Sequence, residues 1–377
     1  MPRYAGSNYR KLDNFKDLLE RGCKCIITTH SLFLAADMEV VNLIKSRDYN
    51  LIIDEAISCV SLVSSGARRC EYEDFDKLDD ALILTNDEIE WLRSNKMIEV
   101  GHGNIVKWIG KPSEYHKYLR IENLCEVGGL IFVNNTILVW RFPPMILKSF
   151  KTVKILTYQF EKSALNAYFR AYKIEYELRG LEKSGDAYIF AEYNPKGENR
   201  HKYLDLINLC NDKMLNSIGE KCGKENPLSA GWYKKANKKK ELLKKLRHNT
   251  INYLRHKVSA SRDTVMWSAF KKYENNLSPD GFKTIDESQK IPTFVACNAR
   301  ASNDYIRRYN LVYLCNTFIN PNITEFFRQR GISIDESGYA QNELLQWLFR
   351  SRLREMKPIN LYLPSERMRK ILIEWAA

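Results

Sequence analysis

Two neighbouring carboxylates at the end of an apolar run are the first residues whose types and spacing suit chemistry. Asp54 and Glu55 directly follow residues 51–53 (LII), which we expect to form a buried strand. In an open parallel sheet, ligands collect at the carboxyl ends of the strands, where an Asp-Glu pair can hold Mg2+ through water and polarise an attacking water molecule. Taken alone, the same pattern is more often a surface strand end.

A threonine ends a second apolar run. Thr157 closes residues 153–157, another expected core strand, so it is a second polar residue at a buried strand terminus. The alternative for Thr157 is a helix cap for the segment that starts near Ser163. Both interpretations remain open from the residues alone.

A predicted helix over residues 342–355 carries several arginines. Gln346, Arg350 and Arg354 stand at positions i, i+4 and i+8, which places them on one ridge of that helix. Arg352 projects from within the apolar face, and a buried arginine needs a partner or a route to solvent. It can snorkel, pair with a carboxylate, or aim its planar donor fork at a phosphate.

A further polar cluster follows the predicted strand over residues 293–296. Its members are Asn298, Arg300, Asn303 and Asp304. Helix capping by Asn303 or Asp304 explains part of this cluster. It does not explain why the cluster begins at a strand end.

The net charge of +13 is concentrated in one segment of the chain. Residues 1–175 carry 24 basic and 23 acidic side chains, whereas residues 200–272 carry 18 and 6, a net of +12. This asymmetry indicates a polyanionic partner, nucleic acid before a membrane surface, or else a solvated helix face. The basic residues cluster in a helical segment at about 200–260, at Lys234, Lys235, Lys238, Lys239, Lys240, Lys244, Lys245 and Arg247.

The aromatic residues of that basic segment have two interpretations. Trp232, Tyr233 and Tyr253 are available for base stacking, but aromatic residues at helical spacing more often belong to a core.

Short β-rich runs alternate with helical patterns, which predicts an α/β fold with largely parallel sheets. Residues 25–29 and 51–53 are expected strands of a first lobe, 1–178, and two hairpin-like segments make residues 60–145 a β-rich insertion in it. Residues 179–377 are expected to form a second lobe with strands at 264–267, 293–296, 311–314 and 360–363.

Composition excludes several classes of protein. No run approaches the roughly 18 apolar residues of a membrane span, and the start has no signal-peptide layout. The nine cysteines are odd in number and contain no CxxC pair, so zinc and redox sites are not indicated. We expect a cytoplasmic protein without a membrane partner, in the host cytoplasm if the source is viral.

Taken in order, these segments resemble the later motifs of a superfamily 2 helicase of the DExD/H type, as found in phage or plasmid replication proteins. Residues 28–33 (TTHSLF) resemble the segment before the Walker B strand, residues 54–57 (DEAI) motif II, and residues 155–158 (ILTY) motif III. Residues 298–304 resemble motif V, and residues 346–354 (QWLFRSRLR) resemble motif VI.

The resemblance implies an ATP-dependent DNA helicase or translocase with two RecA-like lobes, ATP and Mg2+. Asp54 would bind the metal, Glu55 would be the catalytic base, Thr157 would couple hydrolysis to movement, and Arg350 or Arg354 would be the arginine finger. Other residues that would contact nucleotide or phosphate are Gln346, Arg352, Asn298, Arg300 and Asp304.

The sequence contains no GxxxxGK[ST] motif, the loop whose amides and lysine cradle nucleotide phosphates. We therefore expect an incomplete nucleotide site in the latter part of a split, truncated or mis-started helicase, and the split form would have a separate polypeptide that carries the P-loop as its partner. The alternative is a non-catalytic nucleic-acid-binding subunit with a degenerate helicase fold.

Overall fold

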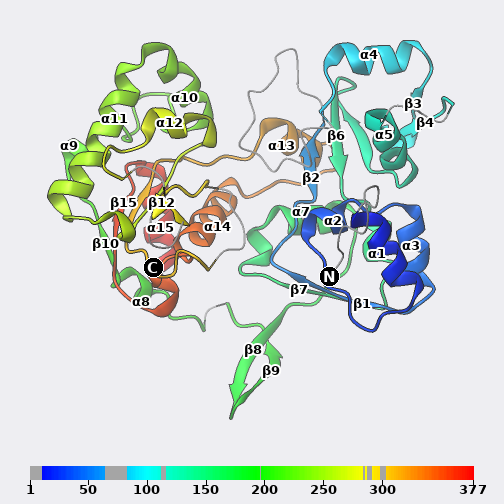
Figure 1. Cartoon of the computed structure of the whole chain (residues 1–377), viewed down its shortest axis with the longest axis horizontal. Coiled ribbons are helices and arrows are strands. Elements are labelled where there is room, and N and C mark those ends of the chain that lie inside the picture. Colours follow the sequence, from blue (N-terminus) through cyan, green and yellow to red (C-terminus); the bar gives the residue numbers. More distant parts are fainter. Residues whose placement is uncertain are drawn as a thin grey trace. The chain divides into compact units, whose positions relative to one another are not determined.

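The computed structural model describes residues 11–63, 83–111, 116–195, 197–282, 285–286, 291–297 and 303–377. The chain divides into two compact units. Unit 1 comprises Met1–Lys173 and Asn320–Ile334, and unit 2 comprises Ile174–Ile319 and Asp335–Ala377. Figure 1 shows the elements of both units, which are described separately.

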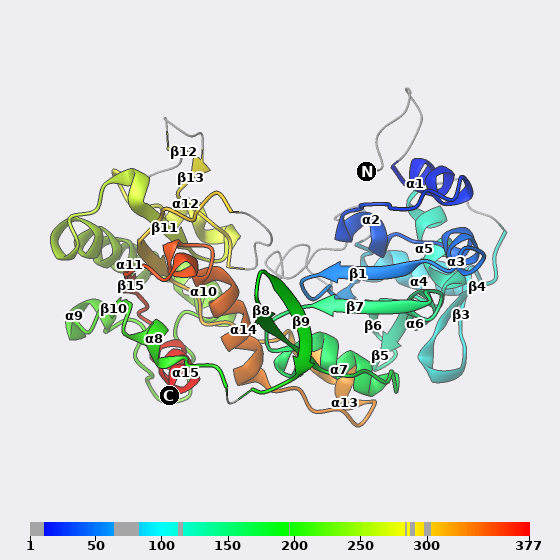
Figure 2. The ribbon, with the colours of Figure 1, turned by 90° about the horizontal axis from the view of Figure 1, so that it is seen from below.

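Within the described residues of unit 1, one pair of parallel strands runs side by side in Figure 2. β1 (Asn50–Asp54) pairs with β7 (Thr152–Leu156), and the register places Ile53 opposite Ile155 and Asp54 opposite Leu156. Both strands were predicted from their apolar runs, but the expectation that they are buried is wrong, because Ile52 is 65% exposed and Leu156 is 46% exposed. Because parallel strands point the same way, the residues after Asp54 and Leu156 lie at one edge of the sheet.

The segment between β1 and β7 forms antiparallel structure, as the hairpin patterns predicted. β6 (Ile137–Arg141) lies between β2 (Val60–Leu62) and β5 (Leu130–Val133), and β3 (Ile98–Val100) pairs with β4 (Val106–Trp108). The helices of this segment are α4 (Asn86–Ser94), α5 (His116–Glu126) and α6 (Pro144–Leu147). A capping box begins α4, since the Thr85 and Glu88 side chains each accept the other's backbone N–H.

The expected strand over residues 25–29 does not form. These residues have no regular structure, and Ile27 is 66% exposed. Thr29 instead caps α2 (His30–Leu34) by accepting the Leu32 N–H. The other helices of this part of unit 1 are α1 (Lys11–Glu20), α3 (Met38–Lys45) and α7 (Ala164–Ala171).

Residues 320–334 belong to unit 1 and not to unit 2. The expectation that residues 179–377 form one continuous second lobe is therefore wrong for this segment. α13 (Pro321–Arg328) packs against β2, β5 and α7. Phe326 and Phe327 are fully buried there. Burial of an aromatic side chain contributes about 1.5–3 kcal/mol, which explains why the helix joins this core.

Unit 2 is built on a four-stranded parallel sheet of order β10-β15-β14-β11. These strands are β10 (Ile207–Leu209), β15 (Ile359–Tyr362), β14 (Asn310–Tyr313) and β11 (Val265–Ser268). Three of the four predicted strands are confirmed within one residue. The fourth, at 293–296, makes only one parallel bridge, between Phe294 and Trp267.

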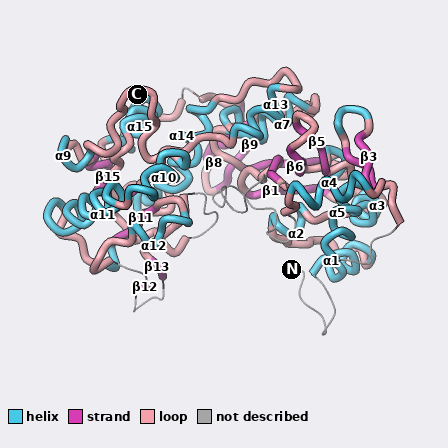
Figure 3. Tube along the Cα trace, turned by 90° about the horizontal axis from the view of Figure 1, so that it is seen from above, coloured by secondary structure: helices cyan, strands magenta, loops and turns pink. Residues whose placement is uncertain are grey.

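Helices cover this sheet and bury its apolar side chains. α10 (Ala230–Ala236) and α12 (Glu274–Leu277) both pack against α11 (Glu241–Asn252), as Figures 1 and 3 show. The other helices are α8 (His201–Leu204), α9 (Lys213–Asn216), α14 (Glu336–Leu348) and α15 (Glu366–Ala376). Two small hairpins complete the unit, β8 (Arg179–Ser184) with β9 (Ala187–Glu192), and β12 (Ile285–Asp286) with β13 (Ile291–Pro292).

Among the helices in the described ranges, none has the length and apolar content needed to cross a membrane.

Candidate functional site

In unit 1 the structure brings Asp54, Glu55 and Thr157 to one edge. Asp54 is the last residue of β1, and Thr157 directly follows β7, its parallel neighbour. The Glu55 N–H donates to the Leu156 carbonyl at 2.9 Å, which extends the ladder by one residue. Asp54 is exposed, while Glu55 and Thr157 are half-buried. Two carboxylates and a hydroxyl are therefore accessible at the carboxyl end of a parallel pair, where ligands bind in such folds.

Glu55 has an unusual backbone conformation, with φ at 70°. A non-glycine residue in the left-handed region costs about 1–2 kcal/mol. Strained residues of this kind concentrate at functional sites, where the surrounding structure holds them. Ten other non-glycine residues in the described ranges also have a positive φ, so the strain at Glu55 is compatible with a functional role and does not by itself assign one.

The capping role considered for Thr157 belongs to another residue. Ser163 is the N-cap of α7, and its hydroxyl accepts the Asn166 N–H at 3.1 Å. Thr157 lies six residues earlier, at the end of β7. It is not the cap of α7.

The single arginine ridge predicted over residues 342–355 is broken in the structure. α14 ends at Leu348, and residues Arg352–Glu355 form a separate 3-10 turn. The extended backbone of Ser351, with ψ at −177°, separates the two, and the Ser351 hydroxyl caps the turn by accepting the Leu353 N–H. Gln346 and Arg350 therefore do not continue into one ridge with Arg354.

These arginines lie at the amino edge of the unit 2 sheet. The Arg352 guanidinium lies 3.9 Å from the centre of the ring of Tyr309, the residue just before β14. Its Nε donates to the carbonyl of Pro358, the residue just before β15. Arg354 is exposed and donates to the Asn303 side chain at 2.7 Å. Arg352 is thus held by two local partners, the Tyr309 ring and the Pro358 carbonyl. Such partners are what an arginine in apolar surroundings requires.

Arg350 and Gln346 lie deeper in the same region. Gln346 is half-buried on α14, and Arg350 is only 7% exposed. Burial and the nearby Asp304 carboxylate raise the pKa of the Tyr305 hydroxyl, and the charges of Arg308 and Arg350 oppose that rise. The charges of Asp304, Arg308 and Arg350 therefore all act on the Tyr305 hydroxyl, which lies before β14. Asn298 and Arg300 lie outside the described residues.

The basic segment presents lysines on the outside of α10 and α11. The described side chains of Lys234, Lys235, Lys238, Lys240, Lys244 and Lys245, here called the lysine surface, are all exposed. Lys235 pairs with Glu225 at 3.2 Å, and Arg247 pairs with Asp280. Within the described ranges, no carboxylate pairs with the lysines at 238, 240, 244 and 245. Nothing is described of the Lys239 side chain.

The aromatic residues of the basic segment are core residues. Trp232, Tyr233 and Tyr253 are at most 8% exposed, and the Tyr233 hydroxyl donates to the Leu314 carbonyl at 2.8 Å. Burial raises the pKa of both tyrosines. Base stacking by these three rings is therefore excluded, which decides between the two interpretations left open by the sequence.

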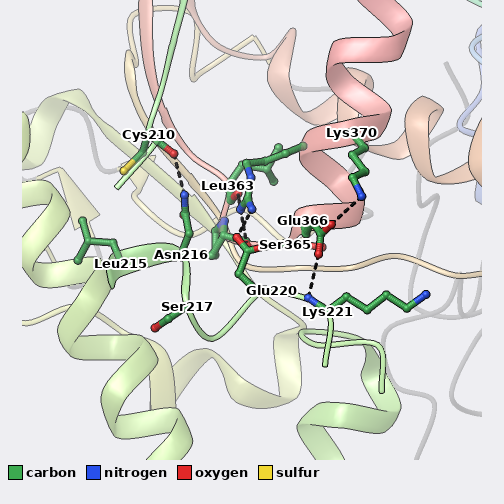
Figure 4. Close-up of polar contacts among 12 residues, drawn as sticks. Cys210, Leu215, Asn216, Ser217, Glu220, Lys221, Leu363, Ser365, Glu366 and Lys370 are labelled. Atoms are coloured by element: carbon green, nitrogen blue, oxygen red, sulfur yellow. Dashed lines mark hydrogen bonds and ion pairs between the residues drawn. The ribbon is translucent and has the colours of Figure 1, made fainter. Parts of the chain in front are cut away.

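The carboxyl edge of unit 2 contains charged residues that sequence reasoning missed. Figure 4 shows the loop after α9 against the start of α15. The Glu366 carboxylate accepts the Lys221 N–H at 3.0 Å and the Lys370 ammonium at 2.6 Å. Arg369 donates to the carbonyls of residues 363 and 364 and pairs with Glu220. Because these charged groups pair with one another, they hold the loop against the helix, and few of their hydrogen-bonding atoms remain available to a ligand.

Arg367 is a half-buried cation at the same edge. Its guanidinium donates to the Asn316 side chain at 3.0 Å, to the Thr317 carbonyl at 2.8 Å and to the Glu336 carbonyl at 3.2 Å. Burial lowers the pKa of Arg367. Ser365, which follows the predicted strand over residues 360–363 and caps α15, was the sequence signal that could have located Arg367, because the first turn of such a helix lies at the carboxyl edge.

A prophage protein is similar to most of this chain. The SPbeta prophage-derived uncharacterized protein YonV of Bacillus subtilis (strain 168) is 31% identical over 362 residues, which span 93% of this chain and 79% of that protein. The chain belongs to the YonV family. Residues 199–376 match the YonV C-terminal Rossmann-like domain, and residues 80–140 match the YonV middle domain.

The match to the C-terminal domain of the YonV family agrees with the parallel sheet of unit 2, so an α/β fold with a Rossmann-like C-terminal domain is established. The YonV middle domain falls within the antiparallel segment between β1 and β7. No solved structure matches the chain. The matched names describe a fold and a prophage origin, and they name no reaction.

Proposed function

We propose that this chain is the nucleic-acid-engaging part of an ATP-dependent helicase or translocase with two RecA-like lobes, DNA being the favoured substrate. The observation that carries the proposal is the edge formed by Asp54, Glu55 and Thr157 on parallel strands, with Glu55 held at φ 70°. The order of the motif-like segments along the chain supports the same conclusion.

The residues at this edge fit a magnesium nucleotide. Mg2+ is usually bound by one or two carboxylates, with waters and substrate phosphates as the remaining ligands. Asp54 is exposed and can supply one such oxygen. The described ranges contain no group of three or more His, Cys, Asp or Glu residues that could hold a metal by themselves, so the phosphates of ATP would complete the coordination.

Each of the other residues has a role that its environment allows. Glu55 would orient and deprotonate the attacking water, and Thr157 would sense the nucleotide from the neighbouring strand end. Arg354 is the most exposed of the three arginines and is our candidate for the finger, whereas Gln346 on α14 and Arg350 just after that helix would support it. Asn298, Arg300, Asp304 and Arg352 remain candidates for nucleotide contacts.

The lysine surface would bind the nucleic-acid backbone. Its exposed lysines at 238, 240, 244 and 245 pair with no carboxylate in the described ranges, and such lysines attract phosphates and release counterions when they bind. This surface also supports a second candidate function, a non-catalytic nucleic-acid-binding subunit, because it needs no nucleotide. Both functions would operate in the host cytoplasm.

Steady-state ATP turnover distinguishes the two functions. The chain is assayed with and without single-stranded DNA, and with and without a P-loop polypeptide encoded in the same genome. The helicase proposal expects DNA-stimulated turnover in the mixture, and loss of that turnover in Glu55→Gln. DNA binding with no turnover in any mixture supports the non-catalytic subunit. Turnover that survives in Glu55→Gln contradicts the assignment of the catalytic edge.

A further inference from the structure

The β8–β9 hairpin is a two-stranded ribbon that pairs with no other strand in the described parts of the chain (Figure 1). Gly185, with φ at 61°, begins the two-residue turn between Ser184 and Ala187. An isolated two-stranded hairpin is marginally stable in water. A ribbon of this kind gains order when a ligand or partner covers one of its faces.

Alternation along the strands divides the ribbon into two different faces. Leu181 lies opposite Phe190, and Lys183 lies opposite Tyr188, so these four side chains share one face, here called the aromatic face. The other face carries small and acidic residues together with one large apolar side chain, at positions Gly180, Glu182, Ser184, Ala187, Ile189 and Ala191.

The aromatic face is open to solvent. Leu181 is 62% exposed, Tyr188 is 71% exposed and Phe190 is 58% exposed. Adjacent exposed apolar side chains of this size mark interaction surfaces. The isolated ribbon therefore presents two rings and an aliphatic side chain to a binding partner.

The aromatic face carries Lys183 beside its rings, whereas the acidic Glu182 lies on the other face and Asp186 lies in the turn. Lys183 lies directly opposite Tyr188, and within the described ranges it has no carboxylate partner. At the base of the ribbon, Arg179 lies opposite Glu192 and pairs with Glu177 at 2.8 Å, so it adds little charge. Rings next to an uncompensated cation form the surface that stacks on bases while it contacts the phosphate backbone.

We propose that the aromatic face of the β8–β9 hairpin binds single-stranded nucleic acid by stacking Tyr188 and Phe190 on successive bases. The inference extends the proposed nucleic-acid binding. The lysine surface contacts phosphates, whereas the hairpin contacts bases. It also supplies the stacking rings that Trp232, Tyr233 and Tyr253 do not provide.

The test compares two probes that differ only in their bases. The full chain is titrated with a fluorescent thymidine oligonucleotide and with an abasic oligonucleotide of the same length and charge. Stacking changes affinity by roughly 5- to 150-fold for each base, so we expect the wild-type protein to bind the thymidine probe at least several-fold more tightly than the abasic probe.

The variant Tyr188→Thr/Phe190→Val keeps residues that favour strands and removes both rings. We expect it to bind the two probes with equal affinity. Tyr188→Trp/Phe190→Trp should keep the preference for the thymidine probe. Ile189→Ala is the matched control, because Ile189 is 51% exposed on the same strand but on the other face, and it should keep the wild-type preference.

Failure of the hairpin proposal differs from failure of the proposed function. If the wild-type protein binds both probes equally, or the variant without rings keeps the preference, the hairpin does not stack on bases. If the ring substitutions leave binding unchanged but alter the sedimentation of the protein, the face is a protein interface and the proposal is wrong. If neither probe binds, nucleic-acid binding itself is refuted.

Discussion

Gly219 lies against the backbone of Pro364 so closely that a Cβ on Gly219 would be 1.9 Å from the Pro364 carbonyl oxygen. The contact joins the loop after α9 to the start of α15, and the Gly219 carbonyl accepts the Glu366 N–H at 3.0 Å. No side chain can be accommodated there without a shift of the backbone. This close backbone contact holds the loop after α9 against the start of α15 at the carboxyl edge of the unit 2 sheet.

Substitution of this glycine should destabilise the protein. We expect Gly219→Ala to lower the free energy of unfolding by about 1–3 kcal/mol, because the backbone must move to admit the methyl group. Gly231→Ala is the control, since a Cβ there meets nothing within 4 Å and Gly231 lies in α10. It should be neutral or stabilising by up to about 1 kcal/mol. Denaturant unfolding of both variants measures the difference, and equal effects would contradict the close approach.

Replacement of the strained residue Glu55 should raise the stability of the protein but abolish its activity. Glu55→Gly removes a side chain at φ 70° and should raise the free energy of unfolding by about 1 kcal/mol. The same change should abolish ATP turnover in the mixture with the P-loop polypeptide. Lys96→Gly is the matched control, because Lys96 is an exposed residue at φ 52°. It should be stabilised similarly and keep its turnover. Turnover retained by Glu55→Gly would contradict the role of the carboxylate.

Substitutions of Ser163 and Thr157, at the two ends of the segment after β7, should affect different properties of the protein. Ser163→Ala removes the cap of α7 and should destabilise the protein by about 1 kcal/mol. Thr157→Ala should change the free energy of unfolding by less than about 0.5 kcal/mol, and it should slow DNA-stimulated turnover. Chemical denaturation and the ATPase assay test the pair. A large loss of stability in Thr157→Ala would indicate a structural role.

Lysines of the lysine surface should determine the salt dependence of DNA binding. Each phosphate contact on single strands contributes about −0.7 to the slope of log K against log salt concentration. We therefore expect Lys244→Ala and Lys245→Ala each to make the slope shallower by up to about 0.7. Lys45→Ala, an exposed helical lysine in unit 1, should leave the slope unchanged. An equal effect of Lys45→Ala would indicate non-specific attraction.

The Glu366 carboxylate should make stability depend on pH in the acid range. Its hydrogen bonds with the Lys370 ammonium and the Lys221 N–H lower its pKa to about 2. Because the folded pKa lies below the ordinary value of about 4.5, the contribution to stability is complete above that value and is lost as the pH falls towards 2. Glu366→Gln should have a lower Tm than wild type at pH 7, and the gap should close between about pH 5 and pH 2. Thermal unfolding over that range measures it, and a constant gap would contradict the interpretation.

The sequence by itself determined the elements whose signals are local. Apolar runs of neighbouring residues predicted five strands, and the structure confirms them as β1, β7, β11, β14 and β15. The capping box of α4 is equally local, because it joins two residues of one turn. The two hairpins of the middle segment follow from alternation and turn residues in the same way. The sequence placed Asp54 and Thr157 at the ends of two predicted strands, and the parallel pairing brings both to one edge.

Only the tertiary structure decided which faces those elements bury and which groups meet. The apolar run at 25–29 has no strand partner and stays irregular, whereas α13 crosses from the second half of the sequence to bury Phe326 and Phe327 in unit 1. Arg352 lies on Tyr309 at the amino edge, and the aromatic residues of the basic segment lie in the core. Such outcomes depend on long-range packing, because burial releases free energy only where another part of the chain supplies the complementary surface.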